Sequence, residues 1–317
     1  MQRVVVIANP VASQFTGGSH RDVMALLNSR FEVEALWPGS APEATAAAEQ
    51  AVAEDAEIVV AMGGDGMVHH VAQGLVGTET ALGIIPAGTT NVVARLFGIP
   101  AKHTKAVRLM TDATPARRVG TARLTLERGH IETVHHAVFA AGLGLDAEVV
   151  RVADSDPYRK YRFGSLHYAR SALGVGFKDY PSIKPHVTVD SGAKTATATT
   201  ALVQFREVYT YFGKIGLRLD DTAPDPMSVL LLDRLKRRRI PNILLSALTH
   251  RDLDGIKGFD VWGSVDTLNF VADPPVAVQA DGEGLGLADG GSVDWAADSL
   301  LIVAGSQTRR ATPEVSD

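Results

Sequence analysis

Short apolar runs alternate with segments of helical spacing through the first third of the chain. The apolar runs predict strands at residues 3–8, 31–37, 58–62 and 81–86. The segments of helical spacing predict helices at residues 21–28, 42–54, 68–76, 91–97 and 102–111. This alternation is typical of a parallel sheet flanked by helices. We therefore expect residues 1–115 to form a doubly wound α/β domain.

The pattern changes after Pro115, where strand and hairpin signals replace the alternation. The predicted strands lie at residues 121–126, 131–141, 185–190, 195–205, 228–232, 267–271, 276–280 and 300–303. A single helical stretch, residues 165–177, interrupts them. Many strands with few long helices favour an antiparallel β-sandwich. We expect this second domain to span residues 116–305 and to be followed by a polar tail, residues 306–317.

The junction after the third strand carries the strongest chemical signal. The strand runs into Gly63-Gly64-Asp65-Gly66, and a helix follows. Glycines let the backbone approach a ligand closely, and the start of a helix presents free N–H groups, so the junction is suited to phosphate. Asp65 would repel phosphate unless a metal ion or a proton transfer intervenes, which indicates phosphoryl chemistry. The alternative is that Asp65 braces the turn by binding nearby amides.

A second loop repeats this arrangement after the fourth strand. It reads Ala87-Gly88-Thr89-Thr90-Asn91 and enters the next helix. Its hydroxyl and amide groups can either cap that helix or contact nucleotide oxygens, and each reading suits them equally. Ligands of parallel sheets bind beyond the carboxyl ends of the strands, where both loops fall. The two loops together predict a binding site.

Two acids lie near the end of the chain, in Asp281-Gly282-Glu283 after the alternating strand 276–280. Gly282 can form the tight bend that turns both carboxylates toward a neighbouring cleft. One acid can then accept a proton from a substrate hydroxyl while the other binds Mg²⁺ or orients its partner. As a local motif, however, the tripeptide is more typical of a solvated acidic turn than of a catalytic site.

Composition narrows the class of protein. A chain of 317 residues with 45% hydrophobic and 21% charged residues fits a two-domain globular enzyme. No apolar run reaches the roughly 18 residues of a membrane-spanning helix, and no signal-peptide pattern precedes the first strand, so we expect a cytoplasmic protein. The absence of cysteine excludes disulfides, thiol nucleophiles and thiolate metal sites, and a net charge of −5 gives no global basic surface for nucleic acid.

The two glycine loops resemble the nucleotide-binding half of the diacylglycerol kinase family, which includes bacterial lipid kinases and sphingosine kinases. The resemblance extends to Asn9-Pro10, to Gly142-Leu143-Gly144-Leu145-Asp146-Ala147 and to the tripeptide at 281–283, and so covers nearly the whole chain. It implies in-line attack of a lipid hydroxyl on the γ-phosphate of ATP, with Mg²⁺ neutralising the developing charge.

The family pattern also assigns roles to residues. Catalysis falls to Glu283, Asp281 and Asp65, with Glu283 slightly favoured as the general base and Asp281 or Asp65 at the metal. ATP would be bound by Asn9, Ser40, Gly63, Gly64, Asp65, Gly66, Met67, Gly88, Thr89, Thr90 and Asn91. A structural metal loop of bacterial members corresponds to residues 224–229, where Asp225 is the remaining acid beside two prolines.

Several positions depart from the family pattern. Met67 stands where a Thr is usual, and His70 stands where a Glu is common. The first loop lacks its usual glycine, and only Ser40 can replace a Thr after the second strand. These changes fit a divergent acceptor or a catalytically weak protein that binds nucleotide or lipid. The related NAD kinases, which phosphorylate a soluble acceptor, share the Gly-Gly-Asp-Gly loop, but residues 86–100 and 281–283 favour the lipid kinases.

A lipid substrate requires contact with a membrane surface. Basic and aromatic clusters at residues 159–163 and 235–240, the latter before the apolar segment 243–248, can bind anionic headgroups transiently; each is equally well read as a solvated face. The bacterial members suggest a homodimer. The histidine pairs at 69–70 and 135–136 lack a metal-binding spacing, and we interpret them as structural.

Overall fold

The computed structural model describes residues 1–154, 182–212, 215–219, 226–234 and 258–305. Several sequence predictions lie outside these ranges. They are the helix at 165–177, the clusters at 159–163 and 235–240, the apolar segment 243–248, the metal-loop residue Asp225 and the tail 306–317.

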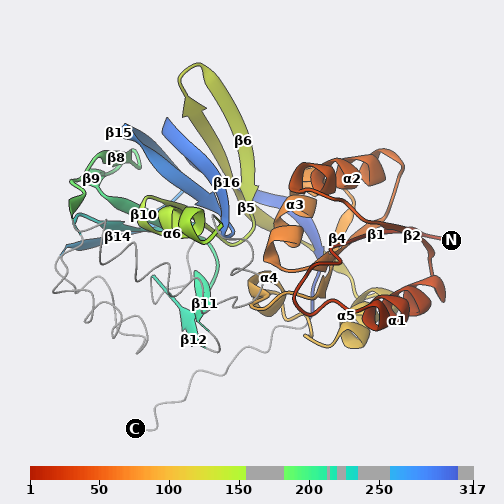
Figure 1. The fold of residues 1–317 in the computed structure, drawn as a ribbon. Helices are drawn as coiled ribbons and strands as arrows, with labels where there is room; N and C mark the ends of the chain where they lie inside the picture. Colours follow the sequence, from red (N-terminus) through yellow and green to blue (C-terminus); the bar gives the residue numbers. More distant parts are fainter. Residues whose placement is uncertain (155–181, 213–214, 220–225, 235–257, 306–317) are drawn as a thin grey trace, which may run out of the picture.

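The N-terminal part is the predicted parallel sheet with helices on both faces. Its strands are β1 (Arg3–Ala8), β2 (Glu32–Leu36), β3 (Ile58–Gly63) and β4 (Ala81–Pro86), in the order β2-β1-β3-β4. Its helices are α1 (Gly17–Asn28), α2 (Ala41–Ala53), α3 (Asp65–Leu75), α4 (Val92–Leu96) and α5 (His103–Thr111). Helices α2 and α3 cover one face, while α1 and α5 cover the other (Figure 1).

Burial explains why this sheet forms. Every residue of β4 is buried, as are five of the six residues of β1, because the helices exclude water from both faces. Helix α3 also packs tightly on α2. A Cβ on Gly74 would lie 2.9 Å from the Cβ of Ala48, so the helices approach this closely only because Gly74 has no side chain.

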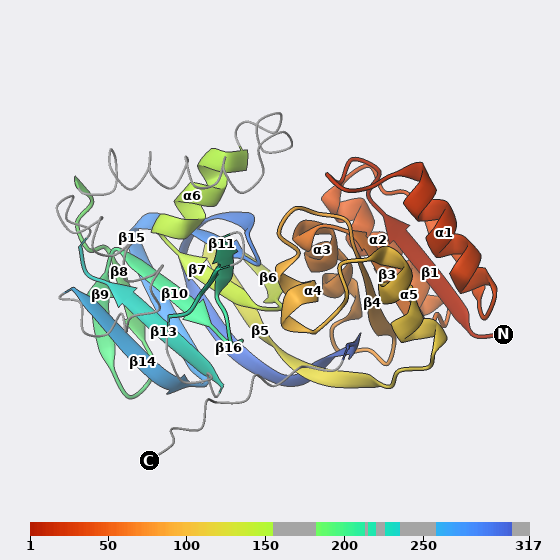
Figure 2. The same cartoon turned by 90° about the horizontal axis from the view of Figure 1, so that it is seen from below.

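The C-terminal part is built mainly from antiparallel strands, as predicted. They are β5 (Ala116–Arg128), β6 (Ile131–Ala137), β7 (Ala140–Leu143), β8 (Val187–Asp190), β9 (Thr195–Ala198), β10 (Thr200–Gln204), β11 (Thr210–Phe212), β12 (Ile215–Leu217), β13 (Met227–Leu232), β14 (Phe259–Val265), β15 (Thr267–Ala280) and β16 (Glu283–Val303). A second apolar core lies among them, and helix α6 (Leu145–Asp154) packs beside β15 and β7 (Figure 2).

Two long strands connect the halves of the molecule. Strand β16 pairs with β5 along most of its length, and its last residues continue the parallel sheet, with Ile302 opposite Leu82 of β4. Strand β5 begins at Ala116, one residue beyond the predicted domain boundary. Because β5 and β16 contribute to both cores, the division into residues 1–115 and 116–305 stays a prediction.

Local predictions fail where long-range contacts intervene. Residues 131–141, predicted as one strand, are divided into β6 and β7 by Val138 and Phe139. Helix α6 was not expected in the strand-rich half. Strand β16, predicted only at residues 300–303, extends back to Glu283.

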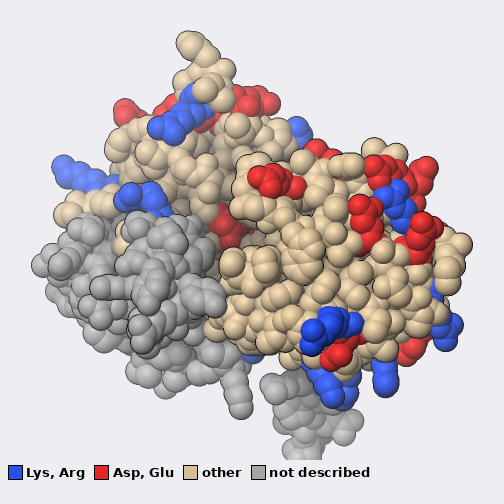
Figure 3. Space-filling view, turned by 45° about the vertical axis from the view of Figure 1, so that its right-hand side comes forward, with Lys and Arg blue, Asp and Glu red and all other residues tan. Residues whose placement is uncertain are grey.

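Basic and acidic side chains are interspersed on the face shown in Figure 3, and the described residues form no continuous basic surface there. None of the described helices is long and apolar enough to cross a membrane.

Candidate active site

The two glycine loops lie against each other at the carboxyl ends of β3 and β4. Gly63 is opposite Pro86 in the sheet, and the Ala87 N–H donates to the Gly63 carbonyl at 2.8 Å. A Cβ added to Gly88 would lie 2.5 Å from the Cα of Gly64. The predicted adjacency of the loops is therefore present, and it requires glycine because the two backbones are in contact.

A third loop, which follows β1, lies against this pair. The Gln14 N–H donates to the Ala87 carbonyl at 2.8 Å, and the hydroxyls of Ser13 and Thr89 are 3.0 Å apart. The predicted site residue Asn9 uses its Oδ1 to accept the Val11 N–H at 3.0 Å, which shapes the loop. Ser13, which was not among the predicted site residues, is the hydroxyl that this loop adds to the site.

Asp65 caps helix α4 from the neighbouring loop. Its Oδ1 accepts the Val93 N–H at 3.1 Å. Burial raises the pKa of Asp65 to about 6, although the Val92 and Val93 amides act in the opposite direction. The sequence had offered residues 89–91 as caps. Instead Asn91, in the left-handed region at φ 49°, exchanges two hydrogen bonds with the Gly88 backbone and holds that loop in place.

Three other predicted ATP-binding residues have different surroundings. Ser40 caps α2 by pairing with Glu43, and no hydrogen bond joins it to the glycine loops in the described part of the chain. The side chain of Met67 packs against the N-terminal core beside Gly63, where a Cβ on that glycine would lie 2.7 Å from the Cβ of Met67. Thr90 lies within the second loop and is half-buried.

The turn between β15 and β16 holds the two C-terminal acids. Asp281 and Gly282 both have positive φ, 55° and 82°, as the central residues of a type I′ hairpin turn require. Asp-Gly is a preferred sequence for this turn, so the bend predicted at Gly282 is present.

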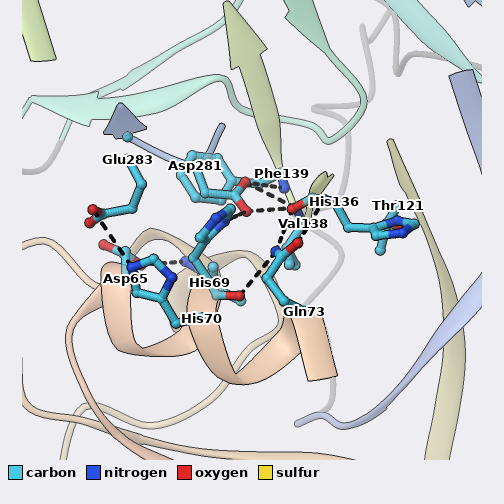
Figure 4. Close-up of polar contacts among 12 residues, drawn as sticks. Asp65, His69, His70, Gln73, Thr121, His136, Val138, Phe139, Asp281 and Glu283 are labelled. Atoms are coloured by element: carbon cyan, nitrogen blue, oxygen red, sulfur yellow. Dashed lines mark hydrogen bonds and ion pairs between the residues drawn. The ribbon is translucent and has the colours of Figure 1, made fainter. Parts of the chain in front are cut away.

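The two carboxylates point in different directions, contrary to the expectation that both face a cleft. Asp281 is 3% exposed, and its oxygens accept the N–H groups of Val138 and Phe139 at 2.8 to 3.0 Å and that of Ala140 at 3.3 Å. Its Oδ2 also lies 2.9 Å from Nδ1 of His69 (Figure 4). Because these contacts occupy its lone pairs, Asp281 is poorly suited to bind a metal or accept a substrate proton.

Glu283 lies instead against the first turn of α3. A Cβ on Gly66 would overlap its Oε1, so the carboxylate comes this close only because residue 66 is glycine. Its Oε2 is 3.9 Å from Nε2 of His70. The side chain is partly exposed and adjacent to the Asp65 loop, so Glu283 is the acid that the turn presents to the site (Figure 4).

Helix α3 connects the two halves through a polar stripe at i, i+4 and i+8, formed by Asp65, His69 and Gln73. Asp65 binds α4 and His69 binds Asp281, while Gln73 exchanges hydrogen bonds of 2.7 and 2.8 Å with the backbone of His136 in β6. The roles of His69 and Gln73 were not predicted. The available signal was this spacing, which places three polar side chains on one face of a half-buried helix.

The Gly142–Ala147 segment forms a separate buried network. The Tyr209 hydroxyl donates to the Asp146 carboxylate, which also accepts from Nε2 of Gln279 at 2.8 Å. Burial raises the pKa of Asp146. A Cβ on Gly142 would overlap this carboxylate, so the glycine makes room for it.

Residues 3–122 match the family model described as the diacylglycerol kinase catalytic domain. The resemblance to the diacylglycerol kinase family is confirmed. A diacylglycerol kinase of Mycobacterium tuberculosis is 37% identical over 106 residues, which cover 33% of this chain and 34% of the relative. The matched segment thus spans about a third of that relative's length.

Solved structures extend the likeness to the whole fold. A diacylglycerol kinase from Bacillus anthracis superposes with a TM-score of 0.67 at 17% identity, covering 96% of this chain and 97% of that one. Yeast NADH kinase, solved with NADH, gives a TM-score of 0.54 at 12% identity and covers 100% of this chain and 90% of its own. At these identities the comparisons show a shared fold only. Because the NADH kinase has this fold as well, the fold does not distinguish a lipid acceptor from a soluble one.

Proposed function

We propose that this protein is an ATP-dependent lipid kinase that transfers the γ-phosphate to a lipid hydroxyl, such as that of diacylglycerol. The observation that carries the proposal is the placement of Glu283 against the glycine-rich start of α3. A proton acceptor from the C-terminal half then lies beside the loops that would bind the nucleotide phosphates. The family match over residues 3–122 supports the kinase class.

The loops fit ATP because they combine glycine backbones with the start of a helix. Phosphate oxygens would bind the amides at Gly64 and Gly66, where α3 begins, and the positive end of the helix dipole would favour their charge. Ser13, Thr89 and Thr90 add hydroxyls along the same edge. Asn91 acts indirectly, because its amide group holds the loop around Gly88 in shape.

Glu283 is the best-placed proton acceptor among the three predicted acids. Asp281 is saturated with hydrogen bonds, and Asp65 uses one oxygen to cap α4. In the proposed step the lipid hydroxyl oxygen bonds to the γ-phosphorus as the bond to the β-γ bridging oxygen breaks. The hydroxyl proton passes to Glu283, and ADP leaves. Asp281 would then be a positioning residue that fixes the turn.

Mg²⁺ would neutralise charge on the phosphates during transfer. No group of three or more His, Asp or Glu side chains suited to a metal occurs among the described residues. Mg²⁺ at kinase sites commonly uses one or two carboxylates together with substrate phosphates and water, so this finding is compatible with it. Asp65 lies in the first glycine loop, and it is the carboxylate that would help to hold the ion there.

The acceptor class is tested by product analysis. Purified protein would be incubated with γ-labelled ATP, Mg²⁺ and mixed micelles of lipid extract, with NAD added in a parallel reaction. Label that moves into the lipid fraction, and is lost in Glu283→Gln but retained in the exposed control Glu132→Gln, would support a lipid kinase. Label in NADP would identify a soluble acceptor. Nucleotide binding without any labelled product would identify a binding protein and refute the proposal.

A further inference from the structure

A cavity of about 200 Å³ lies at the end of α4 that is farther from the Gly88 loop. It is lined by Leu96, Phe97, Arg117, Arg118, Val119, Arg206 and Glu207. Three of these residues are arginines and one is an acid, so the lining is cationic. None of them belongs to the predicted ATP-binding or catalytic set.

Arg206 places a buried guanidinium at this cavity. Its Nε donates to the Val138 carbonyl at 3.0 Å and its Nη2 donates to the Gly120 carbonyl, both neutral acceptors. Among the residues that the structure describes, nothing accepts a hydrogen bond from Nη1. Burial lowers the pKa of Arg206 to about 10, which leaves the side chain charged at neutral pH.

A second cation, Arg117, lies at the same aromatic ring as Arg206. The Arg117 guanidinium is 5.6 Å from the centroid of the Phe97 ring, and that of Arg206 is 5.2 Å from the same centroid. Arg117 is exposed, and in the described chain no carboxylate lies within ion-pair distance of it. The Asp281 carboxylate raises the pKa of Arg206 and so partly offsets the effect of burial, while the charge of Arg117 lowers that pKa further.

The remaining charged residues of the cavity already have partners. Arg118 pairs with Glu79, and Glu207 pairs with Arg218 at 2.8 Å. The acid in the lining therefore does not neutralise Arg117 or Arg206. Two guanidiniums that line one cavity favour the binding of an anion there, because each offers charge-assisted N–H donors and an anion between them reduces their mutual repulsion.

We propose that this cavity binds a phosphate dianion between Arg117 and Arg206, at a site separate from the glycine loops. The planar guanidinium offers paired N–H donors that match phosphate oxygens, and the aromatic ring of Phe97 holds both arginines in place. Either free phosphate or the phosphate monoester of a lipid headgroup has this chemistry. The inference does not depend on the proposed kinase activity.

Calorimetric titration with two probes tests the site. Inorganic phosphate and a short-chain phosphatidate kept below its micelle concentration would each be titrated into the full chain. Titrations would be repeated with a saturating non-hydrolysable ATP analogue, so that binding at the glycine loops is separated from binding at the cavity. We expect at least one probe to bind in both conditions, and the tighter probe would identify the source of the phosphate.

Arg117→Gln is the informative variant, because its exposed side chain can be changed without disturbing the core. Loss of one charge-assisted contact should weaken binding at least about tenfold. The matched control is Arg123→Gln, which removes an exposed charge from the same strand, β5, outside the cavity. Arg206→Lys keeps the positive charge but removes the paired N–H donors of the guanidinium, so it should also weaken binding. Equal affinity in Arg117→Gln and wild type, or no binding of either probe, would overturn the proposal.

Discussion

Nδ1 of His69 lies 2.9 Å from Oδ2 of Asp281, and the two side chains are only 2% and 1% exposed. This contact joins helix α3 of the N-terminal half to the β15–β16 turn of the C-terminal half. The backbone amides of Val138 and Phe139 also bind Asp281. These contacts together fix the position of the turn, and therefore the position of Glu283, which follows it. The pair therefore links the stability of the turn to the geometry of the candidate site.

Removing the imidazole should reveal this coupling. In His69→Ala, Asp281 loses a buried partner, and we expect the free energy of unfolding to fall by about 2 to 4 kcal/mol through the lost hydrogen bond and the cavity. His69→Asn retains an N–H donor near the same place and should lose clearly less. Urea denaturation measures both variants. Equal losses of unfolding free energy in the two variants would show that the missing side-chain volume, and not the lost hydrogen bond to Asp281, causes most of the destabilisation.

A side chain at Gly66 should displace Glu283. The Cβ of Gly66→Ala would occupy the space of the carboxylate, so we expect kcat to fall by about 100-fold or more while the fold persists. Gly17→Ala is the control, since a Cβ there meets nothing within 4 Å. Steady-state kinetics of both variants checks this. A wild-type kcat in Gly66→Ala would show that Glu283 does not take part in the reaction.

The buried carboxyl of Asp65 should make stability depend on pH. Its pKa is about 6 in the folded protein and 3.8 ordinarily, so the folded state binds more protons between these values, and stability falls as the pH rises through this window. The cost is complete above the folded pKa and amounts to at most about 3 kcal/mol.

Asp65→Asn tests this pH dependence because an amide oxygen can still cap α4. Relative to wild type, the variant should gain stability progressively between pH 4 and pH 7, and its advantage should disappear near pH 4. Urea unfolding at four pH values measures it. Asp55→Asn, at an exposed position with φ 58° that Asn tolerates, should show no such trend. A pH-independent difference for Asp65→Asn would contradict the assignment.

The network around Asp146 should be structural. Tyr209→Phe removes a donor from a buried carboxylate, and we expect the free energy of unfolding to fall by about 1 to 3 kcal/mol. Tyr211→Phe provides the comparison, because its hydroxyl makes no hydrogen bond within the described chain and the Arg95 contact uses its ring. Thermal and urea unfolding of the pair would separate the two cases. Equal stability in both variants would exclude this role for Tyr209.

Local pattern was sufficient for the elements of the N-terminal half. Strands β1 and β4 have the predicted bounds, because a fully covered parallel sheet needs continuous apolar runs and the flanking helices show amphipathic spacing. The glycine loops could also be placed, since their position after β3 and β4 follows from the alternation of strands and helices.

Pairings between distant residues could not be predicted. The separation of β6 from β7 depends on Asp281, which lies about 140 residues further along the chain and takes the amides that a continuous strand would use. The cap of α4 by Asp65 is likewise a contact between loops. Residues 89–91 carried the local capping signal, but the neighbouring loop supplied the carboxylate.

The different roles of Asp281 and Glu283 also depend on the fold. In the sequence they are two acids separated by one glycine, and either can serve as base. In the folded protein the turn sends one into a nest of backbone amides and the other onto the first turn of α3. The two acids therefore differ only through their contacts in the folded protein, which are with Gly66 for Glu283 and with the amides between β6 and β7 for Asp281.

In the proposed mechanism Glu283 accepts the substrate proton, while Asp281 only holds the turn. The most direct test measures kcat for lipid phosphorylation, the ATP dissociation constant and urea stability together in Glu283→Gln and Asp281→Asn. We predict that Glu283→Gln loses at least about 100-fold in kcat with wild-type stability and ATP affinity, whereas Asp281→Asn loses stability as well as activity. A Glu283→Gln enzyme with wild-type kcat, or an Asp281→Asn enzyme that is inactive yet fully stable, would contradict the claim.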